Sequence, residues 1–209
     1  MNDFFENLGD QKKERILNAA IAEFAHKKYE DASTNNIVIA AQIGKGMLFR
    51  YFGNKKNLYL YLYRYVREVM DKEIYSQITG VEMGDLPAIL KQLGIRKLEV
   101  LRRHPDMTDF IAQCAHETSP EVCQEVDAFR KERSIKLKED YLFAHLNMSL
   151  LKPEYRNERT VKLIRWALDG CMEQLRDNYK GQNIQGTDIE ERMKDFDVYV
   201  EIIRQAFYC

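Results

Sequence analysis

Apolar residues recur at helical spacing along most of this 209-residue chain, and this pattern limits the fold more than any other feature. Intervals of three and four residues place side chains on one face of an α-helix. They are most regular near the C-terminus, in the series Ile164, Leu168, Cys171, Leu175 and the series Ile189, Met193, Phe196, Val200, Ile203, Phe207. The chain has only four prolines, which interrupt helices. The sequence therefore predicts an all-α fold.

Residues 58–65 are the one stretch in which leucine and tyrosine alternate as in a β-strand. Helical spacing groups the same stretch equally well, and a strand here would have no partner in a sheet, because no other segment alternates in this way. We therefore expect a long helix that starts near residues 54–56. Its tyrosines would spread around it, and buried tyrosine rings with wet hydroxyls suit a helix packed between two domains.

Positive charge is concentrated in one segment. Between Ser33 and Arg67 there are six basic residues and no acidic one, so the rest of the chain carries a charge of −7 within a total of −1. A confined basic segment is expected of a surface that contacts phosphates, because neutralising phosphates releases counterions. The alternative is a solvated face on which charges cluster by chance.

The helices predicted around this segment follow a familiar order. Residues 11–28 form an amphipathic helix, and a second, short helix begins at Ser33 or Thr34, whose hydroxyl can cap it. A glycine-containing turn at residues 42–46 precedes a third helix of about two turns over residues 47–52. Helix, short helix, turn and short helix is the outline of a helix-turn-helix unit.

A set of spaced residues across these helices follows a known family pattern: Phe24, Thr34, Ala41, Ile43, Lys45, Gly46, Leu48, Tyr51, Phe52, Asn54, Lys55 and Leu58. Through these residues, the segment 12–62 resembles the DNA-binding domain of the TetR family of bacterial transcriptional regulators. Three positions depart from the family pattern: Gln42 replaces the usual Gly, Gly44 replaces Ser or Thr, and Phe49 replaces Tyr and so lacks a hydroxyl that could reach a phosphate.

The resemblance implies a helix-turn-helix DNA-binding domain at residues 1–53, a linking helix at 54–79, and a helical effector-binding and dimerisation domain at 80–209. In such a unit the last helix enters the major groove. Lys45 or Arg50 can donate to guanine, and Met47 can touch a thymine methyl. The DNA-contacting candidates are Thr34, Asn35, Lys45, Gly46, Met47, Phe49, Arg50, Tyr51 and Lys55. Each has a plainer alternative, such as Tyr51 packing in the core.

The C-terminal two thirds are predicted to be helical throughout. One helix runs from Leu86 to Leu101 and stops before Pro105, a second spans residues 106–117, and a third opens at Ser119 and runs through Leu146. The last two helices form a hairpin, and the resemblance implies that they pair with a second subunit. The interface candidates are Ile164, Leu168, Cys171, Leu175, Phe196, Val200, Ile203 and Phe207; a second apolar stripe holds Val161, Leu163, Met172, Val198, Tyr199 and Ile202. Either stripe could face the second subunit, or both could belong to one core.

By analogy with the family, a cavity between the middle helices would bind a small apolar or amphipathic effector that releases a repressor from its operator DNA. Candidate lining residues are Met107, Phe110, Ile111, Cys114, Phe143, Leu146 and Trp166. The alternative for each is a place in the hydrophobic core, because apolar residues at helical spacing are usually core residues.

Other functions fit the sequence less well. A metal site at Cys114, His116 and Cys123 is disfavoured because the first two turn to different helix faces and no fourth ligand is evident. An enzyme-like C-terminal domain that binds a small molecule or a metal remains the alternative function; a helical interaction module would leave the basic segment unexplained. Widely spaced cysteines and the lack of a long apolar run favour a cytoplasmic protein. The resemblance implies a homodimeric regulator, so we expect no cofactor and no enzyme activity.

Overall fold

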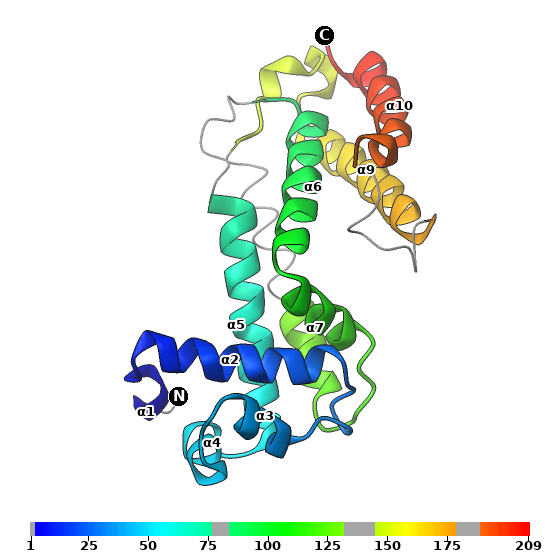
Figure 1. Cartoon of the computed structure of the whole chain (residues 1–209). Helices are drawn as coiled ribbons and strands as arrows, with labels where there is room; N and C mark the ends of the chain where they lie inside the picture. Colours follow the sequence, from blue (N-terminus) through cyan, green and yellow to red (C-terminus); the bar gives the residue numbers. More distant parts are fainter. Residues whose placement is uncertain (1–2, 77–83, 132–144, 179–188) are drawn as a thin grey trace. The chain divides into compact units, whose positions relative to one another are not determined.

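The computed structural model describes residues 3–76, 84–131, 145–178 and 189–209. These residues form helices joined by turns, without a β-strand among them; two isolated bridges, Gly84 with Leu146 and Leu151 with Tyr208, are their only β-type pairings. The predicted all-α fold is confirmed (Figure 1). The chain divides into two compact units. Unit 1 comprises Met1–Glu73 and Arg103–Ile135, and unit 2 comprises Ile74–Arg102 and Lys136–Cys209.

Unit 1 contains the helices predicted for a helix-turn-helix domain, in the predicted order. They are α2 (Asp10–Ala25), α3 (Thr34–Ala40), α4 (Lys45–Phe52) and α5 (Lys55–Ser76). A short N-terminal helix, α1 (Asp3–Glu6), precedes them, and α7 (Pro105–Ala115) packs against α2 (Figure 1). Residues 123–131 are also helical. The further extent of the predicted helix from Ser119 lies outside the described residues until His145, and residues 120–122 form a turn rather than its first turn of helix.

The core of unit 1 forms where α2, α5 and α7 meet. Phe24 from α2, Tyr59 from α5 and Phe110 from α7 are each almost fully buried. Their rings meet at steep angles, with centroids 5.0 Å apart for Phe24 and Tyr59 and 5.4 Å apart for Tyr59 and Phe110. Edge-to-face contacts of this kind add to the stability gained by burying the rings. These ring contacts therefore hold α2, α5 and α7 together.

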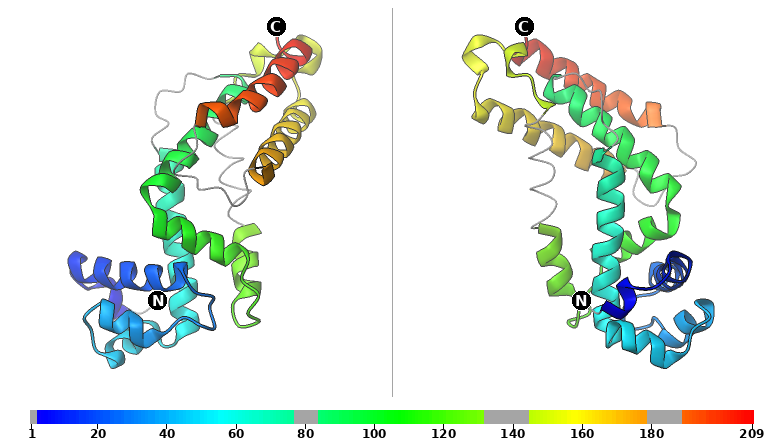
Figure 2. Two further views of the ribbon diagram at one scale, coloured as in Figure 1. Left: turned by 45° about the vertical axis from the view of Figure 1, so that its right-hand side comes forward. Right: turned by 90° about the vertical axis from the view of Figure 1, so that its left-hand side faces the viewer.

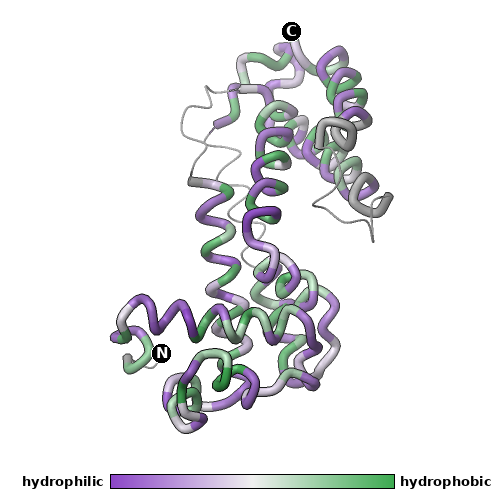
Figure 3. Tube along the Cα trace, in the orientation of Figure 1, coloured by the Kyte–Doolittle hydropathy of each residue, from purple (hydrophilic) through white to green (hydrophobic). Residues whose placement is uncertain are grey.

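Helix α5 confirms that the alternating leucines and tyrosines belong to a helix. Asn54 caps it, because the Asn57 N–H donates to the Asn54 side-chain oxygen at 2.8 Å. The tyrosines divide by helical spacing: Tyr59 and Tyr63 are buried, whereas Tyr61 and Tyr65 are half-exposed. Along each helix, polar and apolar residues alternate at short intervals, as expected of amphipathic helices (Figure 3).

The predicted hydroxyl cap of α3 is wrong. Ser33 stands at the capping position, but its side chain makes no capping hydrogen bond, and Thr34 is already the first helical residue. The carboxylate of Glu23 in α2 accepts hydrogen bonds at this end of the helix instead. Glu23 Oε1 accepts from the Ser33 N–H at 2.8 Å and from the Asn36 amide at 3.2 Å. A charged acceptor makes a stronger bond than a hydroxyl, and it also ties α3 to α2.

Unit 2 is built from α6 (Leu86–Arg103), two 3-10 turns, η1 (Met148–Leu150) and η2 (Pro153–Tyr155), and two long helices, α9 (Glu158–Asn178) and α10 (Ile189–Phe207). Helices α9 and α10 pack against each other, as predicted for the last two helices (Figure 2). The C-terminal end is tied to the start of α6: Arg204 Nε donates to Asp85 at 2.7 Å, and the Leu86 N–H donates to the Tyr208 hydroxyl at 3.1 Å.

Candidate nucleic-acid interface

Helix α4, the expected recognition helix, has an inner and an outer side. It begins after Gly44, whose backbone is extended, and ends at Gly53, whose φ is 78°. Leu48, Tyr51 and Phe52 are buried, whereas Lys45, Gly46 and Arg50 are exposed and Met47 and Phe49 are half-exposed. The predicted DNA contacts on this helix therefore lie together on its outer side, with the exception of Tyr51.

Tyr51 points into unit 1. Only 4% of its surface is exposed, and its hydroxyl is buried without a hydrogen-bond partner in the described structure. Its ring centroid lies 5.7 Å from that of Phe5 in α1. This placement favours the packing alternative that the sequence left open, since a buried hydroxyl does not reach a phosphate in this conformation.

Two glycines at α4 differ in what they permit. A side chain at Gly46 would meet no atom within 4 Å, so the exposed backbone there is open to a close approach by a partner. Gly53 has a left-handed backbone that L-residues rarely adopt, and it ends the helix.

The turn between α3 and α4 contains a left-handed residue that is not glycine. Gln42 has a φ of 52°, at the position where the resemblance leads one to expect glycine. The Ala41 N–H donates to Ile37 O at 2.8 Å, and the Ile43 N–H donates to Val38 O at 3.0 Å, so the chain reverses tightly around Gln42. The sequence-based interpretation of Gln42 as a turn variant agrees with this geometry, in which the turn keeps a glycine-like backbone at an energetic cost.

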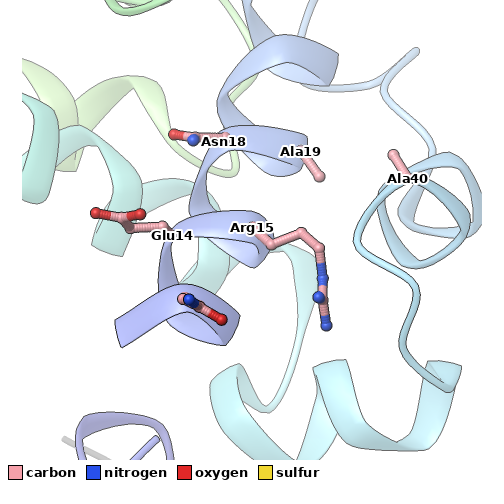
Figure 4. A pocket seen from close by; sticks show the side chains of 6 residues that line it. Glu14, Arg15, Asn18, Ala19 and Ala40 are labelled. Atoms are coloured by element: carbon pink, nitrogen blue, oxygen red, sulfur yellow. The ribbon is translucent and has the colours of Figure 1, made fainter. Parts of the chain in front are cut away.

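Arg15 of α2 secures the same turn from the other side. Its Nε donates to the carbonyl of Ala41 at 2.8 Å, which supplies a partner to a carbonyl at the end of α3. Figure 4 shows Arg15 extending from α2 at the edge of an open hollow of about 470 Å³, which is lined by Gln11, Glu14, Arg15, Asn18, Ala19 and Ala40. Arg15 and Ala41 are 26 residues apart in the chain, so no local sequence pattern predicted this hydrogen bond.

Among the basic residues of the segment, Lys45 and Arg50 project from the outer side of α4. The two lysines at the start of α5 already have partners within unit 1. Lys55 Nζ donates to the carbonyl of Glu30 at 3.0 Å, and burial lowers the pKa of its ammonium group. Lys56 forms an ion pair with Glu125. Of the remaining candidates, Thr34 is half-exposed and Asn35 is exposed at the start of α3.

Two glutamates that follow α7, Glu117 and Glu121, bind the loop between α2 and α3. The Tyr29 N–H donates to Glu117 at 2.9 Å, and the Tyr29 hydroxyl donates to Glu121 at 2.8 Å. Burial, with these carboxylates, raises the pKa of Tyr29. The partners are 88 and 92 residues apart, so sequence reasoning did not find them.

A groove of about 890 Å³ runs along α5 beside the end of α4. Its walls combine aromatic rings with a few polar groups, and the residues that line it are Tyr51, Phe52, Gly53, Asn57, Leu60, Tyr61, Arg64, Tyr65 and Glu68. No sequence pattern had indicated it.

The residues predicted to line an effector cavity lie in both units. Phe110 and Cys114 belong to the core of unit 1, where the Tyr59 hydroxyl donates to Cys114 Sγ at 3.1 Å and burial raises the pKa of the thiol to about 12. Met107 and Ile111 are half-exposed on α7. In unit 2, Leu146 is buried, but Trp166 is 63% exposed. Phe143 lies outside the described residues. For Phe110 and Cys114 the placement favours the core alternative.

The predicted dimer stripe needs a correction. Six of its members, Ile164, Leu168, Cys171, Phe196, Val200 and Ile203, are buried within unit 2 itself, because α9 and α10 turn these faces inward. Phe207 is half-exposed, and the side chain of Leu175 lies outside the described residues. The exposed apolar residues of these helices come from the second stripe, namely Leu163, Val198, Tyr199 and Ile202, together with Trp166. This second stripe is the better candidate for an interface.

In the described part of the chain, no group of three or more histidine, cysteine or acidic residues is placed to hold a metal ion. Of the three residues considered for such a site, Cys114 is buried in the core while His116 is exposed. None of the described helices has both the length and the apolarity needed to cross a membrane.

These features define a helix-turn-helix DNA-binding protein. Residues 16–62 match the model of the family described as bacterial regulatory proteins, tetR family. The resemblance found in the sequence is therefore confirmed over residues 16–62. None of the curated proteins matches it.

Solved structures with similar folds cover nearly the whole chain. A protein from Shewanella sp. PV-4, described as a tetR family transcription regulator, is 21% identical with a TM-score of 0.64, over 95% of this chain and 98% of that one. A TetR family transcriptional regulator from Chloroflexus aurantiacus J-10-FL is 19% identical with a TM-score of 0.59, over 99% and 98% of the two chains. A TetR-like transcriptional regulator from Rhodococcus sp. RHA1 is 18% identical with a TM-score of 0.60, over 96% and 98%. At these identities the likeness shows the fold.

Proposed function

We propose that this DNA-binding regulator acts as a cytoplasmic homodimeric repressor that leaves its operator when a small apolar or amphipathic effector binds its C-terminal region. The outer side of α4 is the observation that supports DNA binding in this proposal. It presents Lys45, Gly46 and Arg50 to solvent, and no acidic residue lies between Ser33 and Arg67 to oppose an approaching phosphate backbone.

The exposed groups of α4 suit a major groove. Arg50 and Lys45 carry the donors that guanine O6 and N7 accept, and Met47 offers an apolar contact for a thymine methyl. Lys45 has no ion-pair partner among the described residues, so its charge is available to DNA. Asn35 at the start of α3 is exposed and can donate its amide to a phosphate, a contact that sets register rather than sequence.

The exposed apolar stripe of α9 and α10 supports the homodimer. Trp166 is 63% exposed, Val198 60% and Ile202 58%, which is unusual for large apolar side chains that have no partner. A second copy would bury them in a self-complementary interface. Dimerisation also serves function, because one recognition helix reads few base pairs and two half-sites multiply specificity.

Release by an effector requires coupling between two sites. An effector that binds the C-terminal region more tightly in the conformation unsuited to the operator shifts the population away from DNA. Because such coupling is reciprocal, operator DNA must lower the affinity for the effector by the same factor.

The first test is selection of binding duplexes from a random library, followed by fluorescence anisotropy of the selected duplex across a salt series. We expect tight binding that weakens as salt rises. Lys45→Ala and Arg50→Ala should each weaken it by about 1–3 kcal/mol and relax specificity at the base pair that the side chain contacts. Arg159→Ala, which removes an exposed cation from α9, is the matched control. Equal affinities for all three variants and the unchanged protein would rule out α4 as the recognition helix.

The interface is tested by the double variant Val198→Asp, Ile202→Asp, with Glu201→Gln on the same helix as control. Burying two carboxylates in an apolar interface costs more free energy than formation of the dimer releases. Sedimentation velocity should show a folded monomer for the double variant and a dimer for the control. A double variant that stays dimeric would place the interface on another surface.

A further inference from the structure

The short N-terminal helix α1 is anchored on the helix-turn-helix unit by one aromatic side chain. Phe5 is 2% exposed, and its ring centroid lies 4.7 Å from that of Phe52 and 5.5 Å from that of Tyr61. Helix α1 also contacts α4 directly. An aromatic residue buried to this degree is costly to withdraw, because its whole ring would return to water. Helix α1 is therefore part of the domain.

A second anchor follows one residue later. Glu6 accepts a hydrogen bond from Lys13 of α2 at 2.8 Å through Oε2, and one from the Tyr61 hydroxyl of α5 at 3.0 Å through Oε1. The backbone carbonyl of Glu6 accepts from Lys13 as well, at 3.0 Å. Together, Phe5 and Glu6 fix α1 against α2, α4 and α5, so the residue before them has a defined position.

That residue, Phe4, is 55% exposed, and its ring supports Arg50. The central carbon of the Arg50 guanidinium lies 4.2 Å from the centroid of the Phe4 ring. A guanidinium that stacks on a ring is attracted by its electron-rich face, while its N–H groups point outward in their own plane. Stacking therefore restrains Arg50 through its contact with the Phe4 ring.

We propose that Phe4 is a positioning residue for DNA binding: α1 holds its ring against the Arg50 guanidinium, so that Arg50 is ordered on the recognition helix before DNA arrives. This inference rests on the proposed function, in which Arg50 contacts the operator. Its physical basis is preorganisation. A side chain that is already restrained loses less conformational entropy on binding, and the saving appears as affinity.

The expected effect follows from the strength of an exposed cation–π pair. Loss of the ring should weaken binding about two- to fivefold for each protomer, or about five- to thirtyfold for a dimer on two half-sites. Phe4→Leu removes the aromatic face while it keeps an apolar side chain. Phe4→Tyr keeps the ring and should restore the affinity of the unchanged protein.

The test is a double-mutant cycle on the selected duplex, with Phe4→Leu, Arg50→Ala and the combination measured by anisotropy. If Phe4 acts through Arg50, Phe4→Leu weakens binding in the unchanged protein and has no effect once Arg50 is alanine. Phe129→Leu is the matched control, because it removes the ring that lies 5.8 Å from Arg64 of α5, an arginine that is not among the predicted DNA contacts. Circular dichroism and thermal unfolding should show that Phe4→Leu leaves the fold intact.

Three results would overturn the inference. Phe4→Leu could bind as the unchanged protein does, it could bind more tightly because Arg50 must leave the ring to reach DNA, or its loss could persist in the Arg50→Ala background. Failure of the proposed function is separate and visible at the outset: the unchanged protein would then select no duplex, and the inference would fall with it.

Discussion

Gln42 offers a direct test of how the helix-turn-helix turn is held. Its φ of 52° lies in the left-handed region, where a Cβ atom costs an L-residue roughly 1–2 kcal/mol. Gln42→Gly removes that cost. Against it stands the greater freedom of glycine in the unfolded chain, worth about 0.5–1 kcal/mol. The Gln42 side chain is exposed, and no hydrogen bond of the described structure holds it, so its removal loses no hydrogen bond there.

The balance predicts that Gln42→Gly stabilises unit 1 by about 0.5–1 kcal/mol, which raises Tm by roughly 1–4 °C for a chain of this size. Gln42→Val should act in the opposite direction, since a β-branched residue fits this backbone worst. Operator affinity should stay the same, because the turn keeps its shape.

Far-ultraviolet circular dichroism during thermal and urea unfolding, at equal protein concentrations, is the suitable measurement. Fluorescence of the single tryptophan, Trp166, would report on unit 2 instead. Amide exchange at Ile43, whose N–H donates to Val38 O, adds a local readout. A Gln42→Gly variant that is less stable than the unchanged protein, or a Gln42→Val variant that is equally stable, would refute the assignment of strain to this turn.

Three further outcomes can be checked independently. Arg15→Ala should cost about 1 kcal/mol by leaving the Ala41 carbonyl without its charged donor, seen as faster amide exchange in α3. The hydrogen bond from Lys13, with that from Tyr61, holds the pKa of Glu6 below its usual value of 4.5. The Glu6 carboxylate therefore stabilises α1 above about pH 4.5, and this stabilisation is lost as the pH falls through the lower pKa of the folded state. Amide exchange of α1, measured against pH, would show the loss. In a thiol titration with a disulfide reagent, exposed Cys209 should react first, and Cys114, whose pKa burial raises to about 12, should react only on unfolding.

Predictions from local patterns agreed well with the structure. The amphipathic helices, the order of the helix-turn-helix elements and the start of α5 near residues 54–56 all follow from spacing, caps and turn residues that are close together in the chain. The alternation of leucine and tyrosine was resolved correctly because a strand needs a partner and a helix does not.

Errors arose where a residue's role depends on what another element places beside it. The sequence offered Ser33 or Thr34 as the cap of α3, but the acceptor is Glu23, ten residues from Ser33 on another helix. Tyr51 matched a family position and was predicted to contact DNA, with core packing as the alternative; the Phe5 ring of α1 lies against it, which favours packing. The amino-acid pattern at the N-terminus gave no sign that two phenylalanines would pack on the recognition helix.

The sequence by itself determined the helical fold, the segregated positive charge and the family of the N-terminal domain, because periodicity, composition and motif spacing are properties of neighbouring residues. Only the tertiary structure decided which of two apolar stripes on α9 and α10 is interior, leaving Trp166 and Val198 exposed. It also decided that Arg50 stacks on Phe4. The sequence does not distinguish two stripes of equal apolarity. Which stripe becomes buried depends on how segments that are far apart in the chain pack together.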